Sequence, residues 1–351
     1  MQFLRNIDPG QLSVLVRLDL DLPRNADGLF DTTRMEDGFD TLIDLWQRKA
    51  KDVTVIAHRG HEPEKSVDFS LEPIAELLYR GLLKQPTMSN FEEGELRSWL
   101  TIKENLRFDS REEEGSLVFA RELAAGHDLF VNDAFATSHR KHTSIVTLPQ
   151  VLPTVFGFQF EREMHAFRRI LNDPARPFVF ILGGAKLETK LPLLEKMADL
   201  VDVILVGGKL AVEANQSQLN YSDALKQKMV IAGITEDTFD ISETAAQDFA
   251  ARISQAQTIV WNGPMGKFED GEHIEGTKTV AGAVIGATQT GAFSLIGGGD
   301  TESALTVLDL EEPGNFSHIS SGGGAMMHYL AHRSLPAIEA ADEAEAAAAS
   351  N

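Results

Sequence analysis

Four clusters of glycine in the second half of the chain each follow a short apolar segment that is typical of a β-strand. They are Gly183-Gly184, Gly207-Gly208, Gly297-Gly298-Gly299 and Gly322-Gly323-Gly324. Glycine lets backbone N–H groups approach a ligand, and a helix that begins there favours anions at its N-terminus. In an open parallel sheet these positions meet at the carboxyl ends of the strands. A single glycine pair is usually only a tight turn, but four in one domain favour a phosphate or nucleotide site.

The two standard nucleotide-binding fingerprints are absent. There is no G-x-x-x-x-G-K-[ST] motif, and no G-x-G-x-x-G is followed about 20 residues later by an acidic residue. The glycine clusters therefore do not indicate a P-loop NTPase or an NAD-dependent dehydrogenase.

Arginines and histidines follow the expected strands of the first half. The arginines are Arg17, Arg34, Arg107 and Arg140, and the histidines are His58, His61, His139 and His142. A lone arginine is more often part of a surface salt bridge, but several at successive strand ends favour a site for phosphate or carboxylate. A metal bound by the histidines is the alternative, although the spacings H-R-x-H and H-x-x-H lack a closing set of ligands.

The composition excludes several classes of protein. The 351 residues are 43% hydrophobic and 24% charged, ordinary values for a globular chain of about two domains. A net charge of −21 argues against general binding to nucleic acid or anionic membranes, because both repel an acidic protein. With no cysteine there is no disulfide framework, thiol nucleophile or cysteine-bound metal.

The basic residues are unevenly distributed. Residues 1–200 hold 25 of the 32 lysines and arginines, and residues 201–351 hold the other 7. If one half binds a multiply charged anion through several arginines, it should therefore be the first. The alternative is that the acidic surface simply keeps the protein soluble.

The elements that must position these residues alternate between short strands and amphipathic helices. In the first half we expect strands at 13–20, 52–58, 100–105 and 127–133, and helices at 35–49, 71–83 and 112–125. In the second half we expect strands at 178–184, 201–208, 258–263, 293–299 and 316–325, helices at 188–199, 274–288 and 301–308, and a last helix. This alternation predicts an α/β fold with doubly wound parallel sheets.

The domain boundaries follow from a break in this alternation. A polar-faced helix at 160–172 separates the two series, so we expect domains at 1–159 and 175–336 with 160–174 as the connecting helix. The Ala- and Glu-rich segment 337–351 is expected to be a solvated or frayed tail. No apolar run reaches the roughly 18 residues of a spanning helix, and no secretory signal is recognisable, so we expect a cytoplasmic protein. Without a heptad repeat or a large apolar stripe, a monomer is expected.

Nine sequence blocks resemble phosphoglycerate kinase and occur in the order found in that family. They are VLVRLDLDLP, DTTR, AHRGHEP, ENLRF, NDAFATSHRKH, ILGGAKLETK, WNGPMGKFE, IGGGDT and SHISSGGGA, which together span about residues 12–336. The resemblance implies two Rossmann-like domains joined by a long helix and a hinge. It also implies that the first domain binds phosphoglycerate and that the second binds the magnesium nucleotide.

The resemblance implies a role for individual residues of the first half. Those that match the family's substrate-binding positions are Asp19, Asp21, Arg34, His58, His61, Arg107 and Arg140. Arg34 is also expected to act in catalysis. Two positions depart from the family: Asp21 replaces an asparagine, and His61 replaces an arginine.

In the second half the resemblance implies a nucleotide site. The matching residues are Gly183, Gly184, Lys186, Lys190, Asn262, Pro264, Glu269, Gly298, Gly299, Asp300 and Thr301. Lys190 would follow the transferring phosphoryl group, Glu269 would face the ribose, and Asp300 would bind Mg²⁺. Gly323 and Gly324 would hold the transferring phosphate at a helix N-terminus. Two further departures are Lys209, in place of a third glycine, and a shortened segment at 209–257 that puts the base-binding pocket in doubt.

Three functions are consistent with this resemblance. The first is reversible phosphoryl transfer between 1,3-bisphosphoglycerate and MgADP, giving 3-phosphoglycerate and MgATP in glycolysis and gluconeogenesis. The second is a non-catalytic nucleotide- or anion-binding paralogue, which Asp21, His61 and the shortened segment would explain. The third is a kinase for a related carboxylate. Phosphoryl transfer needs positioning and charge neutralisation more than covalent chemistry, so a hinge motion that assembles both ligands is expected.

Overall fold

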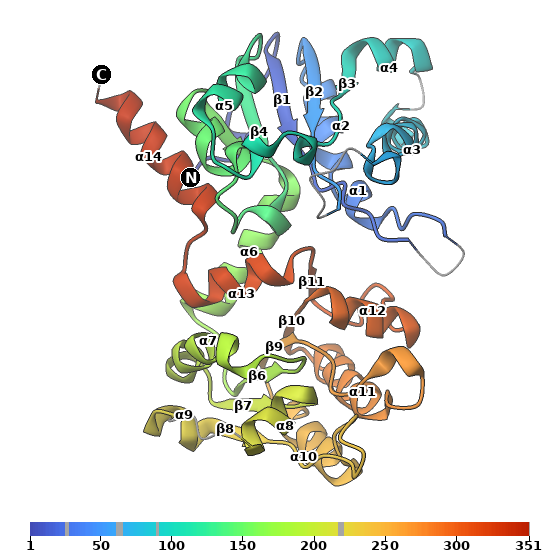
Figure 1. Cartoon of the computed structure of the whole chain (residues 1–351), viewed down its shortest axis with the longest axis vertical. Helices are drawn as coiled ribbons and strands as arrows, with labels where there is room; N and C mark the ends of the chain where they lie inside the picture. The colour runs from blue at the N-terminus through green and yellow to red at the C-terminus, as the bar shows by residue number, and fades with distance from the viewer. Residues whose placement is uncertain (25–27, 61–65, 89–90, 217–220, 351) are drawn as a thin grey trace. The chain divides into compact units, whose positions relative to one another are not determined.

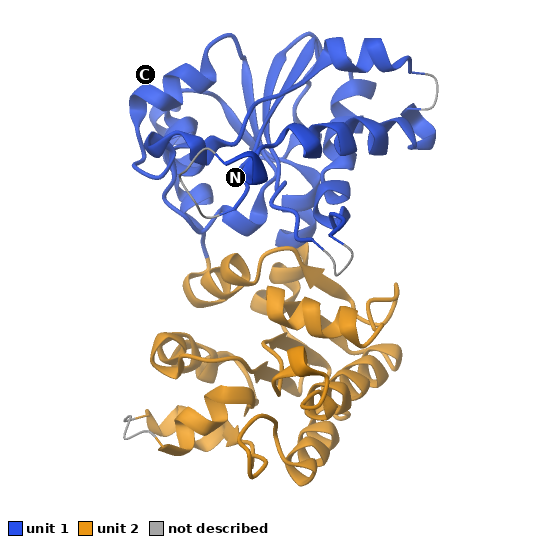
Figure 2. Ribbon diagram, turned by 45° about the vertical axis from the view of Figure 1, so that its right-hand side comes forward, with its two compact units in different colours: residues 1–164, 334–351 blue, residues 165–333 orange. Residues whose placement is uncertain are grey.

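The computed structural model describes residues 1–24, 28–60, 66–88, 91–216 and 221–350. The chain divides into two compact units (Figure 2): unit 1 is Met1–Met164 with Ser334–Asn351, and unit 2 is His165–Arg333. The division falls inside helix α6 (Phe158–Asn172), so this helix is shared by both units. The connecting helix expected at 160–174 is therefore a continuous helix that begins two residues earlier.

Unit 1 is built on a parallel sheet (Figure 1). Within the described residues it has five strands in the order β3-β2-β1-β4-β5. The strands are β1 (Ser13–Arg17), β2 (Asp52–Ile56), β3 (Leu100–Ile102), β4 (Leu129–Asn132) and β5 (Thr154–Phe156). The helices around it are α1 (Thr33–Asp37), α2 (Phe39–Gln47), α3 (Glu72–Leu83), α4 (Glu93–Trp99) and α5 (Leu117–Ala124).

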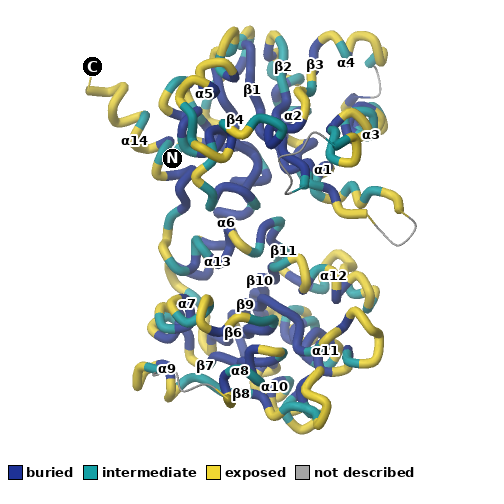
Figure 3. The backbone as a smooth tube through the Cα atoms, in the orientation of Figure 1, coloured by how far each residue is buried: buried dark blue, intermediate teal, exposed yellow. Residues whose placement is uncertain are grey.

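Alternation along β1 explains why unit 1 has three layers. All five residues of β1 are buried, as is typical of a parallel strand covered on both faces (Figure 3). Val14 and Val16 belong to the apolar core that includes residues of α2 and α3, whereas Leu15 belongs to the core that includes residues of α5. Successive side chains of a strand point to opposite faces, so this one segment contributes to both cores.

Unit 2 repeats this architecture. Within the described residues its parallel sheet has six strands in the order β11-β10-β9-β6-β7-β8. They are β6 (Phe178–Leu182), β7 (Val203–Val206), β8 (Met229–Ile231), β9 (Thr258–Asn262), β10 (Phe293–Gly297) and β11 (His318–Ser320). The helices are α7 (Leu187–Leu200), α8 (Gly208–Gln216), α9 (Asp223–Lys228), α10 (Glu243–Ile253), α11 (Glu275–Gln289), α12 (Gly299–Val307) and α13 (Gly323–His332).

The strand order confirms the predicted doubly wound fold. In each sheet, the next strands in the sequence are added on one side of the first strand, and the remaining strands are added on its other side, as in a Rossmann fold. The reversal lies between β1 and β4 in unit 1 and between β6 and β9 in unit 2. Ligands of such sheets bind outside the carboxyl ends of the strands at this switch point.

The structure differs from the sequence prediction at several elements. The helix expected at 35–49 is divided at Gly38 into α1 and α2, and a Cβ on Gly38 would lie 2.9 Å from a methyl carbon of Leu18. The sequence analysis missed the edge strands β5 and β8, each three residues long, whereas the equally short edge strands β3 and β11 lie within predicted segments.

The segment expected to be a solvated or frayed tail is a helix, so it is not frayed, although most residues of its second half are exposed to solvent. Residues Pro336–Ala349 form α14, which packs against the turns η7 (Thr143–Thr147) and η8 (Leu148–Gln150) of unit 1. The apolar side chains of its first turns are buried, and the amino group of Met1 lies 2.5 Å from Asp342. Alanine and glutamate favour helix, and docking on unit 1 supplies the tertiary contacts that an isolated tail would lack.

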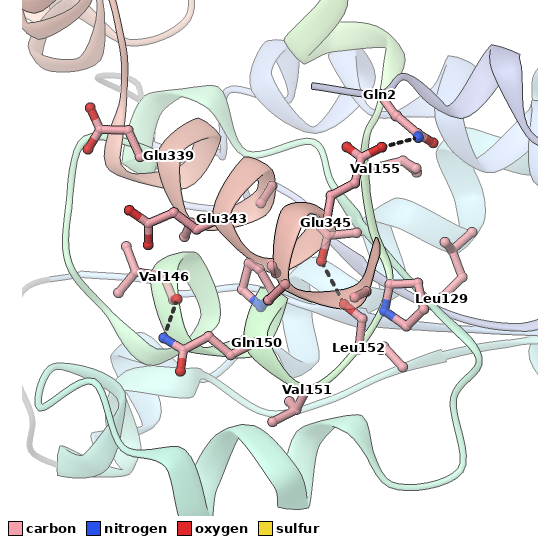
Figure 4. Close-up of a pocket in the computed structure, with 18 of the residues that line it drawn as sticks. Gln2, Leu129, Val146, Gln150, Val151, Leu152, Val155, Glu339, Glu343 and Glu345 are labelled. Carbon is pink, nitrogen blue, oxygen red and sulfur yellow. Dashed lines mark hydrogen bonds between the residues drawn. The ribbon is translucent and has the colours of Figure 1, made fainter. Parts of the chain in front are cut away.

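The small alanine side chains of α14 leave a pocket beside it (Figure 4). Its volume is about 930 Å³, and its walls include Leu152 and Val155 of unit 1. Glu339, Glu343 and Glu345 lie on the α14 side, and Gln2 donates a hydrogen bond to Glu345 at 2.6 Å. None of the residues that the sequence predicts for a functional site lines this pocket.

Asp133 connects the switch point of unit 1 to the start of α6. Its carboxylate accepts hydrogen bonds from Thr41 Oγ1 at 2.6 Å and from the backbone N–H of Phe160 at 2.9 Å. The Thr41 hydroxyl oxygen in turn accepts the N–H of Phe158 at 2.9 Å. A helix leaves its first N–H groups without intrahelical partners, and Asp133 and Thr41 satisfy two of them. Burial raises the pKa of Asp133 to about 6, against hydrogen bonds that lower it.

This raised pKa predicts a pH dependence of stability. The folded state holds the Asp133 proton more tightly than the unfolded chain, so the stabilisation is complete below the ordinary value of 3.8 and is lost as pH rises through about 6. At neutral pH the loss is on the order of 3 kcal/mol. We expect the difference in unfolding free energy between the parent and Asp133→Asn to shift toward the parent by about 2 kcal/mol between pH 7 and 4.5, because pH 4.5 is still above the ordinary value of 3.8. Urea unfolding at both pH values measures it, and a constant difference would contradict the role of Asp133.

Candidate phosphate-binding edges of the two sheets

The charged residues of unit 1 follow the carboxyl ends of its strands. Asp19 and Asp21 come after β1, and His58 lies two residues after β2. Arg107 lies in the turn η4 (Leu106–Phe108) after β3, and Arg140 follows the turn η6 (Phe135–Thr137) after β4. Because parallel strands share one carboxyl edge, these residues are delivered to the same side of the sheet.

Electrostatic interactions show that these residues form one cluster. Burial, followed by the charges of Arg17, Arg107 and Arg140, holds the pKa of His58 well below its usual value. Burial and the same three arginines lower the pKa of His142 to about 4. Each imidazole therefore lies within reach of all three guanidinium groups, and both are neutral at pH 7. The cluster that they form, Arg17, Arg107, Arg140, His58 and His142, is called the arginine cluster below.

Asp19 and Arg34 lie beside this cluster. Burial raises the pKa of Asp19, and the positive charge of Arg34 opposes that rise most strongly. Asp19 also accepts the backbone N–H of Asp21 at 3.2 Å. Arg34 is the second residue of α1, which places the guanidinium within electrostatic reach of the β1 edge.

Asp21, which replaces the family's asparagine, has a local structural role. One of its carboxylate oxygens accepts the N–H of Gly60 at 2.8 Å, and the other lies 3.7 Å from His58 Nε2. The carbonyl of Gly60 accepts a hydrogen bond from Arg107 Nη1. The turn after β2 is thus held between Asp21 and Arg107. His61, the other predicted substrate residue of this turn, lies outside the described residues.

In unit 2 the loops after β6 and β9 touch along their backbones. Gly183 donates its N–H to Asn262 O at 2.8 Å, and Gly184 donates to Pro264 O at 3.3 Å. A Cβ on Gly183 would lie 2.1 Å from Pro264 O, closer than any side chain allows. This contact lies at the switch point. Residue 183 must be glycine because the two backbones approach too closely to leave room for a side chain.

Asn262 and Thr301 join these loops to the next strand. The Asn262 side-chain amide donates to Gly297 O at 2.7 Å, and Thr301 Oγ1 accepts the N–H of Gly263 at 2.7 Å while donating to Gly297 O at 3.1 Å. Both side chains are buried, Thr301 fully. These two predicted nucleotide residues therefore hold the loops in place through their side chains.

The N-termini of α12 and α13 lie close together. A Cβ on Gly323 would lie 2.4 Å from the Cα of Gly298, the residue that precedes α12. Gly299 and Gly324 are exposed within the first turns of these two helices. Two helix N-termini with exposed N–H groups make a site that favours anions. The structure thus brings together the predicted glycines of three loops.

Lys190 and Asp300 complete this edge of unit 2. Burial lowers the pKa of Lys190, and the carboxylate of Asp300 opposes this effect, so the two groups lie within electrostatic reach. Lys190 is in the first half of α7, and Asp300 is exposed in the first turn of α12. A single exposed carboxylate beside a phosphate site fits Mg²⁺, which keeps most of its ligands from water and substrate phosphates. No group of three or more acidic or histidine side chains forms a metal site among the described residues.

Lys186 and Glu269 are less closely joined to this edge. Lys186 is exposed and has a left-handed backbone conformation, with φ 69°. Glu213 of α8 accepts the N–H groups of Lys186 at 3.2 Å and Leu187 at 2.6 Å, so a carboxylate occupies the N-terminus of α7. Glu269 is exposed in the turn η9 (Phe268–Asp270), and in the described part of the chain no hydrogen bond or ion pair joins it to the glycine loops.

The sequence analysis missed several residues that organise these edges. Glu112, Asp133 and Glu213 are carboxylates that hold a loop or a helix N-terminus, and Ser144 joins Glu112 to the loop after β4. His142 was noted as a basic residue but was not predicted as part of the site. Glu112 and Glu213 lie on a turn and a helix, where a carboxylate resembles an ordinary surface residue in a sequence, whereas Asp133 lies in the block NDAFATSHRKH without any indication of its partners.

Two Rossmann-type sheets, one edged by arginines and the other by glycines and helix N-termini, define a two-unit α/β protein with candidate sites for phosphorylated ligands. The profile of the phosphoglycerate kinase family matches residues 4–220 and 212–333. The chain is 34% identical to the phosphoglycerate kinase of Thermomicrobium roseum over 397 positions, covering 96% of this chain and 98% of that protein. It is also 34% identical to the enzyme of Acaryochloris marina, covering 97% and 99%. The chain therefore belongs to the phosphoglycerate kinase family.

Solved structures agree with this assignment. The phosphoglycerate kinase of Coxiella burnetii superposes with a TM-score of 0.78 at 29% identity, covering 97% of this chain and 98% of that one. The enzyme of Pyrococcus horikoshii also gives a TM-score of 0.78, at 25% identity, covering 99% of this chain and 100% of that one.

This chain is shorter than its relatives. The alignment with the Thermomicrobium roseum protein runs over 397 positions, whereas the chain has 351 residues. The two stretches that match the family profile meet at residues 212–220. This junction lies within 209–257, the segment that the sequence analysis identified as shortened.

The backbone contact at the switch point can be tested by adding a single methyl group. We expect Gly183→Ala to lower the unfolding free energy by about 2 to 3 kcal/mol, because its Cβ must displace backbone rather than a flexible side chain. The control is Gly282→Ala in α11, where a Cβ meets open space and helix propensity predicts a gain of about 0.5 to 1 kcal/mol. Thermal unfolding measures both, and equal effects would contradict the steric argument.

Proposed function

We propose that this protein is an active phosphoglycerate kinase that transfers the acyl phosphate of 1,3-bisphosphoglycerate to MgADP, reversibly, giving 3-phosphoglycerate and MgATP. The observation that carries the proposal is the placement of Lys190 near Asp300, at the edge where the glycine-rich N-termini of α12 and α13 meet. A lysine that is partly desolvated beside a phosphate site is suited to neutralise charge on a moving phosphoryl group. We further propose that it acts in glycolysis and gluconeogenesis, as a cytoplasmic monomer.

Unit 1 would bind the phosphoglycerate. Arg107 and Arg140 belong to a cluster in which both imidazoles are neutral at pH 7, so its positive charge comes from guanidinium groups. Guanidinium groups bind phosphate and carboxylate oxygens through paired, charge-assisted hydrogen bonds. Arg34, beside Asp19, would contact the end of the substrate that carries the transferring group.

Unit 2 would bind the nucleotide phosphates. The exposed N–H groups at Gly299 and Gly324 would stabilise negative charge on phosphate oxygens, and Gly323 lets the two helix N-termini approach. Asp300 would hold Mg²⁺ through one carboxylate, and the ion would supply further positive charge to the nucleotide phosphates. Lys190 would stabilise the charge that is distributed over the transferring group when the old bond has lengthened and the new one is forming.

A non-catalytic nucleotide- or anion-binding paralogue is the second candidate, and one observation favours it. The carboxylate of Glu213 occupies the N-terminus of α7, a position that would otherwise be open to a phosphate. A bound carboxylate there opposes an incoming anion by charge repulsion. Binding of MgADP or 3-phosphoglycerate without turnover would support this candidate.

Lys190→Ala tests the catalytic proposal. We expect the parent to phosphorylate 3-phosphoglycerate with MgATP, measured as the hydroxamate that forms when hydroxylamine traps the acyl phosphate. The variant should lose roughly 100-fold or more in kcat with little change in nucleotide affinity, because the lysine acts mainly on transition-state charge. The matched control is Lys196→Ala, an exposed lysine of the same helix, which should keep full activity. Parallel loss of nucleotide binding and turnover would contradict this role for Lys190.

Arg107→Ala tests the assignment of the substrate site to unit 1. Loss of a guanidinium contact to the anion should raise the KM for 3-phosphoglycerate by roughly 10- to 100-fold. The KM for MgATP should stay the same, since the residue belongs to unit 1 and the nucleotide is assigned to unit 2. Steady-state kinetics with each substrate varied in turn measures both values. An unchanged KM for 3-phosphoglycerate would mean that Arg107 only holds the turn at Gly60.

A further inference from the structure

Glu112 is a fully buried carboxylate at the end of the turn η5 (Ser110–Glu112), beneath the arginine cluster. Its oxygens accept the backbone N–H of Ser144 at 3.1 Å and the Ser144 hydroxyl at 2.5 Å. Arg17 Nη1 lies 3.4 Å away, and His142 Nδ1 lies 3.9 Å away. A buried carboxylate is costly unless charge and hydrogen bonds compensate it, and here both are present.

Arg17 is the direct partner of Glu112, and its own contacts are internal. It is the last residue of β1, is fully buried, and donates hydrogen bonds to Ser144 Oγ at 2.5 Å and Thr137 Oγ1 at 3.2 Å. Arg107 and Arg140 repel its charge and Glu112 attracts it. Glu112 is therefore the buried negative charge that balances the base of the arginine cluster.

The Arg17–Glu112 pair also fixes both ends of the loop that carries Arg140. Thr137, at the start of the loop, is bonded to Arg17, and Ser144, just after its end, is bonded to both members of the pair. Thr143 strengthens the second attachment, because its hydroxyl donates to Arg111 O at 2.6 Å and accepts the N–H of Ser116 at 2.7 Å. Arg140 and His142 lie between these two attachments.

We propose that Glu112 is a positioning residue for the substrate site. It holds the loop from Thr137 to Ser144 so that Arg140 faces the anion, and it touches no substrate itself. The inference rests on the proposed function in assigning the anion to phosphoglycerate. In this proposal the affinity for phosphoglycerate, which is itself negatively charged, depends on the buried negative charge of Glu112.

Charge alone predicts the opposite effect of removing Glu112. If Glu112 acted only through its field, Glu112→Gln would make the cluster more positive and would tighten anion binding. If Glu112 positions the loop, the same variant weakens binding. A neutral amide does not balance the charge of Arg17, and it has one oxygen where the carboxylate has two to accept the two hydrogen bonds from Ser144. The sign of the change in affinity separates the two roles.

The experiment compares Glu112→Gln with Glu114→Gln, an exposed carboxylate two residues along the chain. We expect Glu112→Gln to raise the KM for 3-phosphoglycerate at least 10-fold while kcat and the KM for MgATP change less than twofold. Glu114→Gln should match the parent, and Glu112→Asp, which restores the charge, should recover part of the lost affinity. An unchanged or lower KM for 3-phosphoglycerate in Glu112→Gln would overturn the proposal.

A second measurement does not depend on turnover. Hydrogen exchange followed by mass spectrometry should be faster over residues 137–147 in Glu112→Gln than in the parent, with no change in unit 2. If Glu112→Gln does not fold, the second variant is Ser144→Ala, which removes the loop attachment and leaves the Arg17–Glu112 ion pair. Ser144→Ala should show the same faster exchange over residues 137–147. Unchanged exchange in this variant would overturn the proposal. A parent that neither turns over nor binds 3-phosphoglycerate by calorimetry would refute the proposed function, while the exchange result would still decide the role of Glu112.

Discussion

The need to satisfy buried backbone groups at the switch point of each sheet is the constraint on which the two candidate sites depend. In unit 1 the strand β4 ends at Asn132-Asp133, and Asp133 takes the first N–H groups of α6 together with Thr41. In unit 2 the strand β9 ends at Asn262, whose side chain fixes the loop after β10 with the help of Thr301. A buried loop cannot be hydrated, so these side chains take the place of water. The residues of the two candidate sites are positioned by these buried polar contacts.

The second organising feature is the gathering of positive charge in an acidic chain. A net charge of −21 keeps the surface strongly negative, yet Arg17, Arg107 and Arg140 act together on His58 and His142. Like charges assemble only where a counter-charge or a ligand compensates them. The buried carboxylate of Glu112 supplies this counter-charge within the protein, and a bound anionic ligand would supply the rest. Asp21, in contrast, holds the turn at Gly60, which accounts for an acidic residue beside a candidate anion site.

The candidate phosphate-binding edge of unit 2 is assembled in this shortened chain. The two stretches that match the family profile overlap at 212–220, and the glycine loops after β6, β9 and β10 make close backbone contacts. The shortened segment still contains α8, α9, β8 and α10, so the sheet keeps an edge strand. Glu213 of α8 fastens this segment to the start of α7. The shortened segment is thus fastened to the N-terminal end of α7, the helix whose fourth residue is Lys190.

The sequence by itself determined the fold class and proposed most of the residues of the candidate sites. Parallel strands buried on both faces are nearly continuous apolar runs, as in β1 and β6, and glycines or arginines directly after such runs are local signals. Short edge strands such as β8 and the docking of α14 were missed, because each depends on contacts with distant residues. Only the tertiary structure decided which polar residues hold the candidate sites together. Arg17, Asp133 and Thr301 lie in the sequence blocks that resemble the family, but only the structure shows that they are buried. Glu112 and Glu213 carry no sequence signal. The physical reason is that a strand or a turn is encoded by neighbouring residues, whereas a buried ion pair or helix cap requires groups that the fold brings together.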